Sequence, residues 1–204
     1  VVNAARVSFQ KHKEIMDDSD EKLISYLATH NHWTPFSHPQ ITLIEKIPIF
    51  VARQRFKHTV GFTYNEVSRR YVDDPPEFFE PEKWRKRPGG GIKQGSSNIA
   101  LDIHRYYGTD GKHGCDNPFE DVIDICSETY EHLIKIGVAP EQARMVLPQA
   151  MYTEYYVTGS LAAFARAYKQ RRDPHAQKEV RDLAGQWDKI IRPLFPISWK
   201  ALVD

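Results

Sequence analysis

The spacing of apolar residues predicts a helical majority packed with a small sheet. Apolar residues recur at helical spacing over residues 20–29, where Ser19 is the expected N-cap. Residues 41–47 alternate between apolar and polar and predict a strand. Pro48 then stands where a helix can begin, and we expect that helix to run to about His58.

This helix is expected to have one polar and one apolar face. Its polar face carries Gln54, Lys57 and His58, at positions i, i+3 and i+4. An extended segment is predicted over residues 65–72, where alternation places Glu66, Ser68 and Arg70 on one side. An acid, a hydroxyl and a guanidinium are therefore expected to line up.

The second half of the chain predicts four further helices. Asn117 caps the first, which ends at Gly137. The next begins at Pro140 and bends at Pro148. The other two are residues 158–172 and residues 173–195, the latter capped by Asp173. Together with the strands they predict the α+β class, with a small antiparallel sheet in a single domain.

Composition is that of one soluble domain. The chain has 204 residues, 41% of them hydrophobic, which is enough for a substantial core. No window approaches the roughly 20 apolar residues of a membrane helix, and no leader is visible, so a cytoplasmic protein is expected. The chain opens at Val1 without a methionine, and we expect a short N-terminal piece, a strand, to precede it.

Cationic residues are concentrated between residues 50 and 72. The segment holds Arg53, Arg55, Lys57, His58, Arg69 and Arg70 around the carboxylate of Glu66. The net charge of the whole chain is only +1, so a small anion is a better fit than a nucleic acid. Arginines beside a carboxylate and a hydroxyl suggest a nucleotide. A solvated charged face is the structural alternative.

Two other functions remain open at this point. In a module that binds single-stranded nucleic acid, the cations would follow phosphates while Phe62, Tyr64 and Tyr71 stack on bases. In a metal-dependent phosphohydrolase, His30, His32 and His38 would be ligands. No carboxylate accompanies these histidines at ligand spacing, so capping and core hydrogen bonds are favoured and no metal is expected.

Six blocks of the chain, in order, carry a family resemblance. They are AARVSF (4–9), HNHWTPFSH (30–38), IPIFVARQ (47–54), YNEVSRRY (64–71), EQARMVLP (141–148) and DPHAQKEV (173–180). Together they resemble the flavin-dependent thymidylate synthases over nearly the whole chain, except for a variable loop at residues 86–116. The resemblance implies a homotetramer with active sites shared between subunits. It also implies that FAD, 5,10-methylenetetrahydrofolate and NADPH serve the conversion of dUMP to dTMP.

The resemblance assigns site residues position by position. Residues implied to bind dUMP are Gln54, Arg55, Phe56, Lys57, Glu66, Val67, Ser68, Arg69, Arg70, Arg144 and Arg171. Residues implied to bind FAD are Ser8, His32, Thr34, Lys57, His58, Thr59, Glu66, Ser160, Arg166 and His175. Arg171 matches the arginine thought to polarise the pyrimidine. No cysteine nucleophile is expected, because Cys126 reads as core and Cys115 lies in the variable loop.

The chain departs from the family signature at one place. The family has Arg-His-Arg, seven residues and then Ser, whereas this chain has Lys57-His58-Thr59, eight residues and then Ser68. Lysine offers a point charge in place of a planar fork, and threonine removes a charge. We expect Arg166 to compensate, and flavin affinity to be weaker and more salt-sensitive than an Arg-His-Arg site would give.

Overall fold

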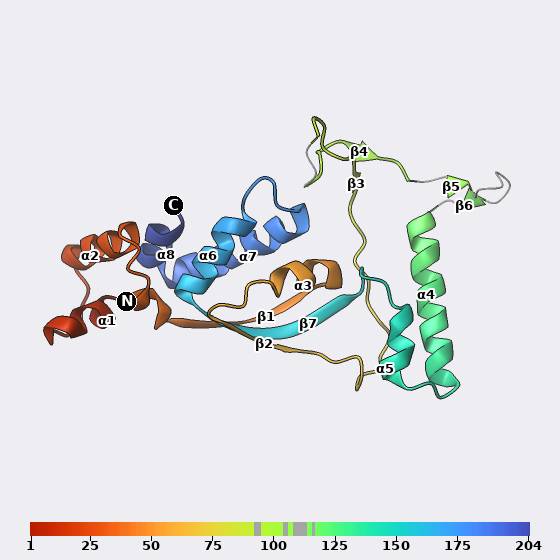
Figure 1. Cartoon of the computed structure of the whole chain (residues 1–204), viewed down its shortest axis with the longest axis horizontal. Coiled ribbons are helices and arrows are strands. Elements are labelled where there is room, and N and C mark those ends of the chain that lie inside the picture. Colours follow the sequence, from red (N-terminus) through yellow and green to blue (C-terminus); the bar gives the residue numbers. More distant parts are fainter. Residues whose placement is uncertain (92–94, 104–105, 108–113, 116) are drawn as a thin grey trace. The chain divides into compact units, whose positions relative to one another are not determined.

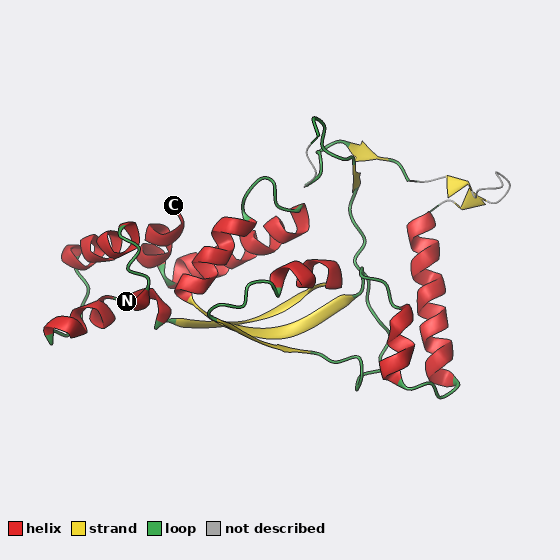
Figure 2. Cartoon of the chain, in the orientation of Figure 1, coloured by secondary structure: helices red, strands yellow, loops and turns green. Residues whose placement is uncertain are grey.

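The computed structural model describes residues 1–91, 95–103, 106–107, 114–115 and 117–204. The chain divides into two compact units, which are described separately. The first unit comprises Val1–Ile44, Gln54–Asn65 and Tyr156–Asp204, and the second comprises Glu45–Arg53 and Glu66–Tyr155. Helices and a small sheet are both present (Figures 1 and 2), so the predicted α+β class is confirmed. None of the described helices combines the length and apolarity needed to cross a membrane.

The main sheet has three strands in the order β1-β7-β2. Its strands are β1 (Gln40–Pro48), β7 (Tyr152–Ser160) and β2 (Phe62–Glu66). β1 runs antiparallel to β7, because Leu161 N donates to Pro39 O at 3.0 Å while Thr42 and Thr158 lie 2.9 Å apart. The central strand, β7, is the last of the three in sequence, as Figure 1 shows.

Helices of the first unit surround an aromatic core. They are α1 (Val2–Arg6), α2 (Asp18–Thr29), α6 (Leu161–Arg171), α7 (Lys178–Leu194) and α8 (Pro196–Val203). The rings of Phe164 and Trp187 meet edge to face at 5.9 Å, and Tyr168 packs against Trp199 at 5.5 Å. Asp188 accepts a hydrogen bond from Trp199 Nε1 at 2.7 Å, which ties α8 to α7.

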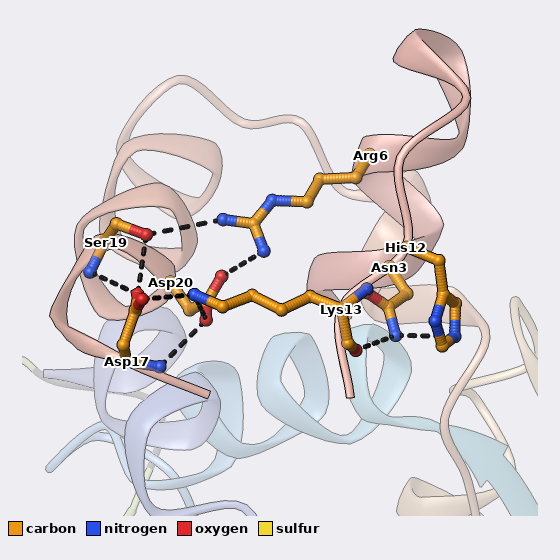
Figure 3. Close-up of polar contacts among 7 residues, drawn as sticks. All are labelled: Asn3, Arg6, His12, Lys13, Asp17, Ser19 and Asp20. Atoms are coloured by element: carbon orange, nitrogen blue, oxygen red, sulfur yellow. Dashed lines mark hydrogen bonds and ion pairs between the residues drawn. The ribbon is translucent and has the colours of Figure 1, made fainter. Parts of the chain in front are cut away.

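A polar network holds the N-terminal segments together, as Figure 3 shows. The carboxylate of Asp20 is buried and forms ion pairs with Arg6 and with Lys13, the latter at 2.9 Å. The predicted N-cap was wrong by two residues, since Asp17 caps α2 by accepting from Ser19 N at 2.9 Å. Asp17 N donates back to Asp20 at 2.9 Å, which completes a capping box that Ser19 cannot form.

The second unit contains α3 (Ile49–Arg55) as far as Arg53, α4 (Pro118–Lys135) and α5 (Pro140–Ala143). The short pairs β3 (Trp84–Arg85) with β4 (Ala100–Leu101) and β5 (Tyr106–Tyr107) with β6 (Gly114–Cys115) are antiparallel. The cap predicted for α4 is confirmed, because Asn117 Oδ1 accepts from Glu120 N at 3.4 Å. The core position predicted for Cys126 was wrong: it is only half-buried, and its neighbour Ile125 is 62% exposed.

Three predicted boundaries differ from the structure. The helix expected to bend at Pro148 ends at Ala143, and residues 152–160 form β7 instead. Alternate burial explains this, because Thr153, Tyr155 and Val157 are buried on one face of a strand. The helix expected from residue 173 begins only at Lys178, and α8 was missed altogether.

Three boundaries between residues 48 and 72 also differ from the prediction. Pro48 ends β1, and α3 stops at Arg55 rather than His58, so Lys57 and His58 do not share its face. The extended segment expected over residues 65–72 ends at Glu66. A turn follows, in which Tyr71 N donates to Ser68 O at 3.0 Å.

Candidate active site

His58 and Arg171 meet in the first unit. Arg171, the last residue of α6, donates from Nε to His58 Nε2 at 2.7 Å and from Nη2 to the Gln54 carbonyl at 3.0 Å. The Gln54 side chain donates to Gln177 Oε1 at 2.6 Å. Gln54, His58 and Arg171, which the resemblance assigned to the site, thus form one cluster. His58 reaches it from the turn after α3 and not from a shared helix face.

Burial and positive charge keep the His58 ring neutral. The ring is 8% exposed, and burial together with Arg171, Arg55 and Arg166 lowers the pKa of His58 to about 4. Because Nε2 accepts the Arg171 proton, the single ring proton belongs on Nδ1. Burial and the charge of Arg55 also lower the pKa of Arg171 from its usual value. Arg171 still remains a cation at neutral pH.

Arg55 lies in the core of the first unit. Its side chain is 1% exposed, and its Cζ lies 4.4 Å from the ring centroid of Phe62 and 4.7 Å from that of Trp187. The rings of Tyr64 and Phe164 are 5.2 and 5.7 Å away. The guanidinium is thus enclosed by aromatic rings, whereas the resemblance implied a nucleotide contact for this residue.

Two cavities in the first unit are lined by five of the ten residues assigned to the flavin. The hydroxyl pocket, about 560 Å³, is lined by Ser8, His32 and Thr34 among others. The cationic pocket, about 460 Å³, is lined by Ser160, Arg166 and Lys169 among others. Both include Asn31 and Trp33 in their linings, so the two cavities share a wall. Their sizes are typical of ligand sites.

The altered signature borders the cationic pocket. Lys57 and Thr59 are both exposed, and the pocket lining continues at Val60 and Gly61. Arg166 reaches this turn from α6 and donates from Nη2 to the carbonyl of Val60. The side chain expected to replace a missing charge therefore also holds the backbone one residue beyond Thr59.

Two assigned residues have local roles at helix starts. Ser160 is 5% exposed and caps α6, with Oγ accepting from Ala163 N at 3.2 Å. His175 is exposed before α7 and lies 3.0 Å from Asp173, which also accepts from His175 N at 2.7 Å. Asp173 thus closes a turn before α7 and does not cap the helix itself.

Phe56 lies in the first unit, where its ring meets that of Tyr64 edge to face at 5.0 Å, and the remaining nucleotide candidates lie in the second unit. Glu66 accepts from Thr153 Oγ1 at 2.7 Å, and Val67 N donates to the Glu154 carbonyl at 2.9 Å. Ser68 Oγ accepts from Arg70 N at 3.4 Å, so these two residues meet through the turn. Other polar groups of this set are Arg69, which donates to Asp74 O, and Arg144, which is exposed and donates to Glu141 O at 3.2 Å.

Sequence reasoning did not single out Trp33, Lys169 or Gln177. Trp33 is 60% exposed at the wall between the two pockets, and Lys169 stands one turn after Arg166. Gln177 orients Gln54 from a position 123 residues away. Trp33 lies inside the block HNHWTPFSH. A tryptophan beside three histidines in a polar segment was the sequence signal that could have identified it.

The histidines of residues 30–38 act in local structure. His30 stacks on Tyr26 at 4.0 Å and its Nδ1 lies 2.8 Å from the Tyr26 carbonyl. His38 lines the hydroxyl pocket. Within the described ranges of the chain, no group of three or more His, Cys, Asp or Glu side chains is placed to hold a metal ion.

Comparison with known proteins gives consistent matches. Residues 1–197 match the family described as "Thymidylate synthase complementing protein". A flavin-dependent thymidylate synthase of Thermosipho africanus is 35% identical over 99% of this chain and 84% of its own length. One from Thermus thermophilus is 35% identical over 100% of this chain and 71% of its own length.

A solved structure is also similar. The UMP/dUMP methylase PolB from Streptomyces cacaoi, bound with 5-Br dUMP, has a TM-score of 0.74 to this chain at 26% identity. The match covers 98% of this chain and 87% of that structure.

Proposed function

The chain belongs to the flavin-dependent thymidylate synthases, and on that premise we propose that it methylates dUMP reductively to dTMP. Methylenetetrahydrofolate supplies the carbon and NADPH the electrons, with FAD as the cofactor. The observation that carries the proposal is the family match over residues 1–197. The similarity to a methylase bound with 5-Br dUMP supports the choice of nucleotide.

The two pockets of the first unit suit a flavin dinucleotide. Such a ligand joins flat ring systems to a diphosphate, and therefore needs apolar, hydroxyl and cationic surfaces together. Trp33 supplies an exposed aromatic face, Ser8 and Thr34 supply hydroxyls, and Arg166 and Lys169 supply charge. We therefore assign FAD to these pockets.

The full set of flavin contacts that we propose follows the family resemblance. The proposed set is Ser8, His32, Thr34, Lys57, His58, Thr59, Glu66, Ser160, Arg166 and His175. When bound, the flavin supplies the hydride that takes the place of a protein nucleophile in electron delivery to the pyrimidine. Cys126 is half-buried on α4 and Cys115 lies in β6, and we propose no covalent role for either.

Arg171 is proposed to polarise the pyrimidine ring. Its Nε and Nη2 are held by His58 and the Gln54 carbonyl, which fixes the plane of the guanidinium. Among the described residues, Nη1 of Arg171 has no hydrogen-bond partner. We propose that the Nη1 protons bind a substrate oxygen. A fixed donor aimed at developing negative charge stabilises the transition state more than the ground state.

The phosphate and sugar of dUMP are assigned to the cationic segment. The proposed contacts are Gln54, Phe56, Lys57, Glu66, Val67, Ser68, Arg69, Arg70 and Arg144. Arg171 is assigned to the pyrimidine ring of the same nucleotide. Arginine forks bind phosphate oxygens in pairs, and Glu66 accepts from a donor such as a hydroxyl. Arg55 is left out of this set because its guanidinium is enclosed by aromatic rings.

We further propose a homotetramer with active sites shared between subunits, in the cytoplasm. Helix α4 exposes apolar side chains, including Val122 at 52% and Ile125 at 62%. Contact with another copy of the chain would bury them.

Turnover by the purified protein tests the proposal. With FAD, dUMP, methylenetetrahydrofolate and NADPH, the protein should form dTMP, and omission of any one component should abolish it. A protein that remains colourless with FAD, or that forms no dTMP when all components are present, contradicts the proposal. An oligonucleotide that binds without competition from dUMP would instead support the nucleic-acid alternative.

A further inference from the structure

Arg55 is a buried charge of the first unit, only 1% exposed, and the assigned chemistry does not use it. A buried guanidinium is costly unless its protons are bonded and its charge is stabilised. Here Nη1 donates to Tyr64 Oη at 2.6 Å, and the rings of Phe62 and Trp187 lie within 4.4 and 4.7 Å of Cζ. Aromatic faces attract such a cation, most strongly where water is excluded. Its position is therefore closely defined.

The hydrogen bonds from Arg55 continue towards the active site. Tyr64 Oη accepts from Arg55 and donates to the His58 carbonyl at 2.7 Å. His58 Nε2 in turn accepts from Arg171 Nε at 2.7 Å. One path of three contacts thus joins a core guanidinium to the arginine proposed to polarise the substrate.

This path requires a neutral imidazole. A protonated His58 would carry a hydrogen on Nε2 and could not accept from Arg171, so the two groups would separate. The charges that bear on the ring are Arg171 and Arg166 from α6 and Arg55 from α3, and all three oppose its protonation. Tyr64, from β2, is the titratable group that contacts the His58 backbone.

We propose that Arg55 is a positioning residue for the reaction: through Tyr64 and through its charge it keeps His58 oriented and neutral, so that Nε2 holds Arg171 in place. Arg55 itself does not contact the substrate. The effect of Arg55 on turnover rests on the proposed function. Its effect on His58 is instead a property of the protein without ligands. The two can therefore fail separately.

The titration of His58 in the full-length protein without ligands is the decisive measurement. Arg55→Met keeps an unbranched side chain that packs well against aromatic rings but removes the charge and the hydrogen bond to Tyr64. NMR should show the His58 pKa rising towards that of an ordinary histidine, because one of the three guanidinium charges that lower it is removed. Arg53→Met, an exposed arginine of the same helix, is the matched control and should leave the His58 titration unchanged. A folded Arg55→Met protein with the His58 titration of the wild type would overturn the proposal.

A second variant decides the matter if Arg55→Met does not fold. Tyr64→Phe keeps the ring and removes only the hydroxyl between Arg55 and His58. Nitrogen NMR should show His58 changing from the Nδ1-protonated tautomer alone to a mixture. An unchanged tautomer in Tyr64→Phe would overturn the proposed path. In active preparations, Arg55→Lys should recover more turnover than Arg55→Met, because it retains the charge.

Discussion

Arg171 and His58 acquire their properties from each other. The residues are 113 positions apart, yet the guanidinium donates to the imidazole, and burial and nearby charge keep that imidazole an acceptor. Neither residue type alone indicates this arrangement. Its chemical result is a cation whose orientation is fixed by two hydrogen bonds.

Arg171→Ala should reduce turnover more than it weakens dUMP binding. The loss of one preorganised donor costs roughly 3 kcal/mol in the transition state, or about a hundredfold in kcat. Steady-state kinetics and dUMP titration of the same protein give the two quantities. Arg172→Ala, at the exposed neighbouring position, is the control and should keep near-normal kcat. Near-normal kcat in Arg171→Ala would exclude the proposed role.

His58 predicts a specific dependence of stability on pH. Its folded pKa of about 4 lies below the 6.5 of an exposed histidine, so between these values the unfolded chain binds the extra proton. Folding stability should therefore fall as the pH is lowered from 6.5 towards 4. Thermal unfolding of His58→Gln, which keeps a side-chain acceptor, should show a smaller fall over this window. An equal fall in both proteins would contradict the assignment.

At the level of elements, α6 and the turn before β2 form one structure around the cationic pocket. Ser160 caps α6, Arg166 of that helix holds the Val60 carbonyl, and Gly61 completes the turn with φ of +78°. The altered signature residue Thr59 lies at the edge of this structure. A change there acts on the shape of the pocket as well as on its charge.

Arg166→Ala should lose FAD affinity, because it removes a cation from the pocket and releases the turn at Val60. Thr59→Arg should leave the affinity equal or improve it, since a charge returns next to the same pocket. Titration of FAD into the apoprotein of each variant, at low and high salt, measures both effects. Unchanged affinity in Arg166→Ala would reject the compensation while leaving the enzyme assignment intact.

Strand β7 packs closely against β2 at Gly159. A Cβ at this position would lie 2.4 Å from the Phe62 ring, which is itself held between Arg55 and Phe164. Gly159→Ala should therefore lower the unfolding temperature, at a cost of roughly 1–3 kcal/mol. The control is Gly89→Ala, where nothing lies within 4 Å. Equal unfolding temperatures for the two variants would show that the sheet adjusts without strain.

For the whole molecule, the candidate residues divide between the two compact units. The first unit holds Arg171, His58 and the two pockets, whereas Glu66, Arg70 and Arg144 belong to the second. Under the proposed assembly, each active site uses residues of more than one subunit.

The mass of the protein in solution tests that assembly. Light scattering after size exclusion should give four times the 23.7 kDa of the chain. Ile125→Glu on α4 should reduce this mass if its exposed apolar face is covered by another copy, while Glu128→Gln on the same helix should not. A monomer that is fully active would contradict the sharing of active sites.

Contacts between neighbours in the chain, and residue identity, were enough to predict several local structures and the kind of chemistry to expect. Asn117 predicted the start of α4 because a side-chain cap is a contact between neighbours in sequence. The six ordered blocks led to the family because they depend on residue identity alone. The strand β7 was missed, because its pairing partners β1 and β2 lie far away in the chain.

Only the tertiary structure decided how the assigned residues are used. It placed Arg55 among aromatic rings, joined Gln54 and His58 through Arg171, and set Trp33 between two pockets. The physical reason is that burial, hydrogen-bond partners and pKa depend on groups over 100 positions apart, such as His58 and Arg171. Spacing along the chain carries no information about such contacts, because they form only when distant segments come together in the folded structure.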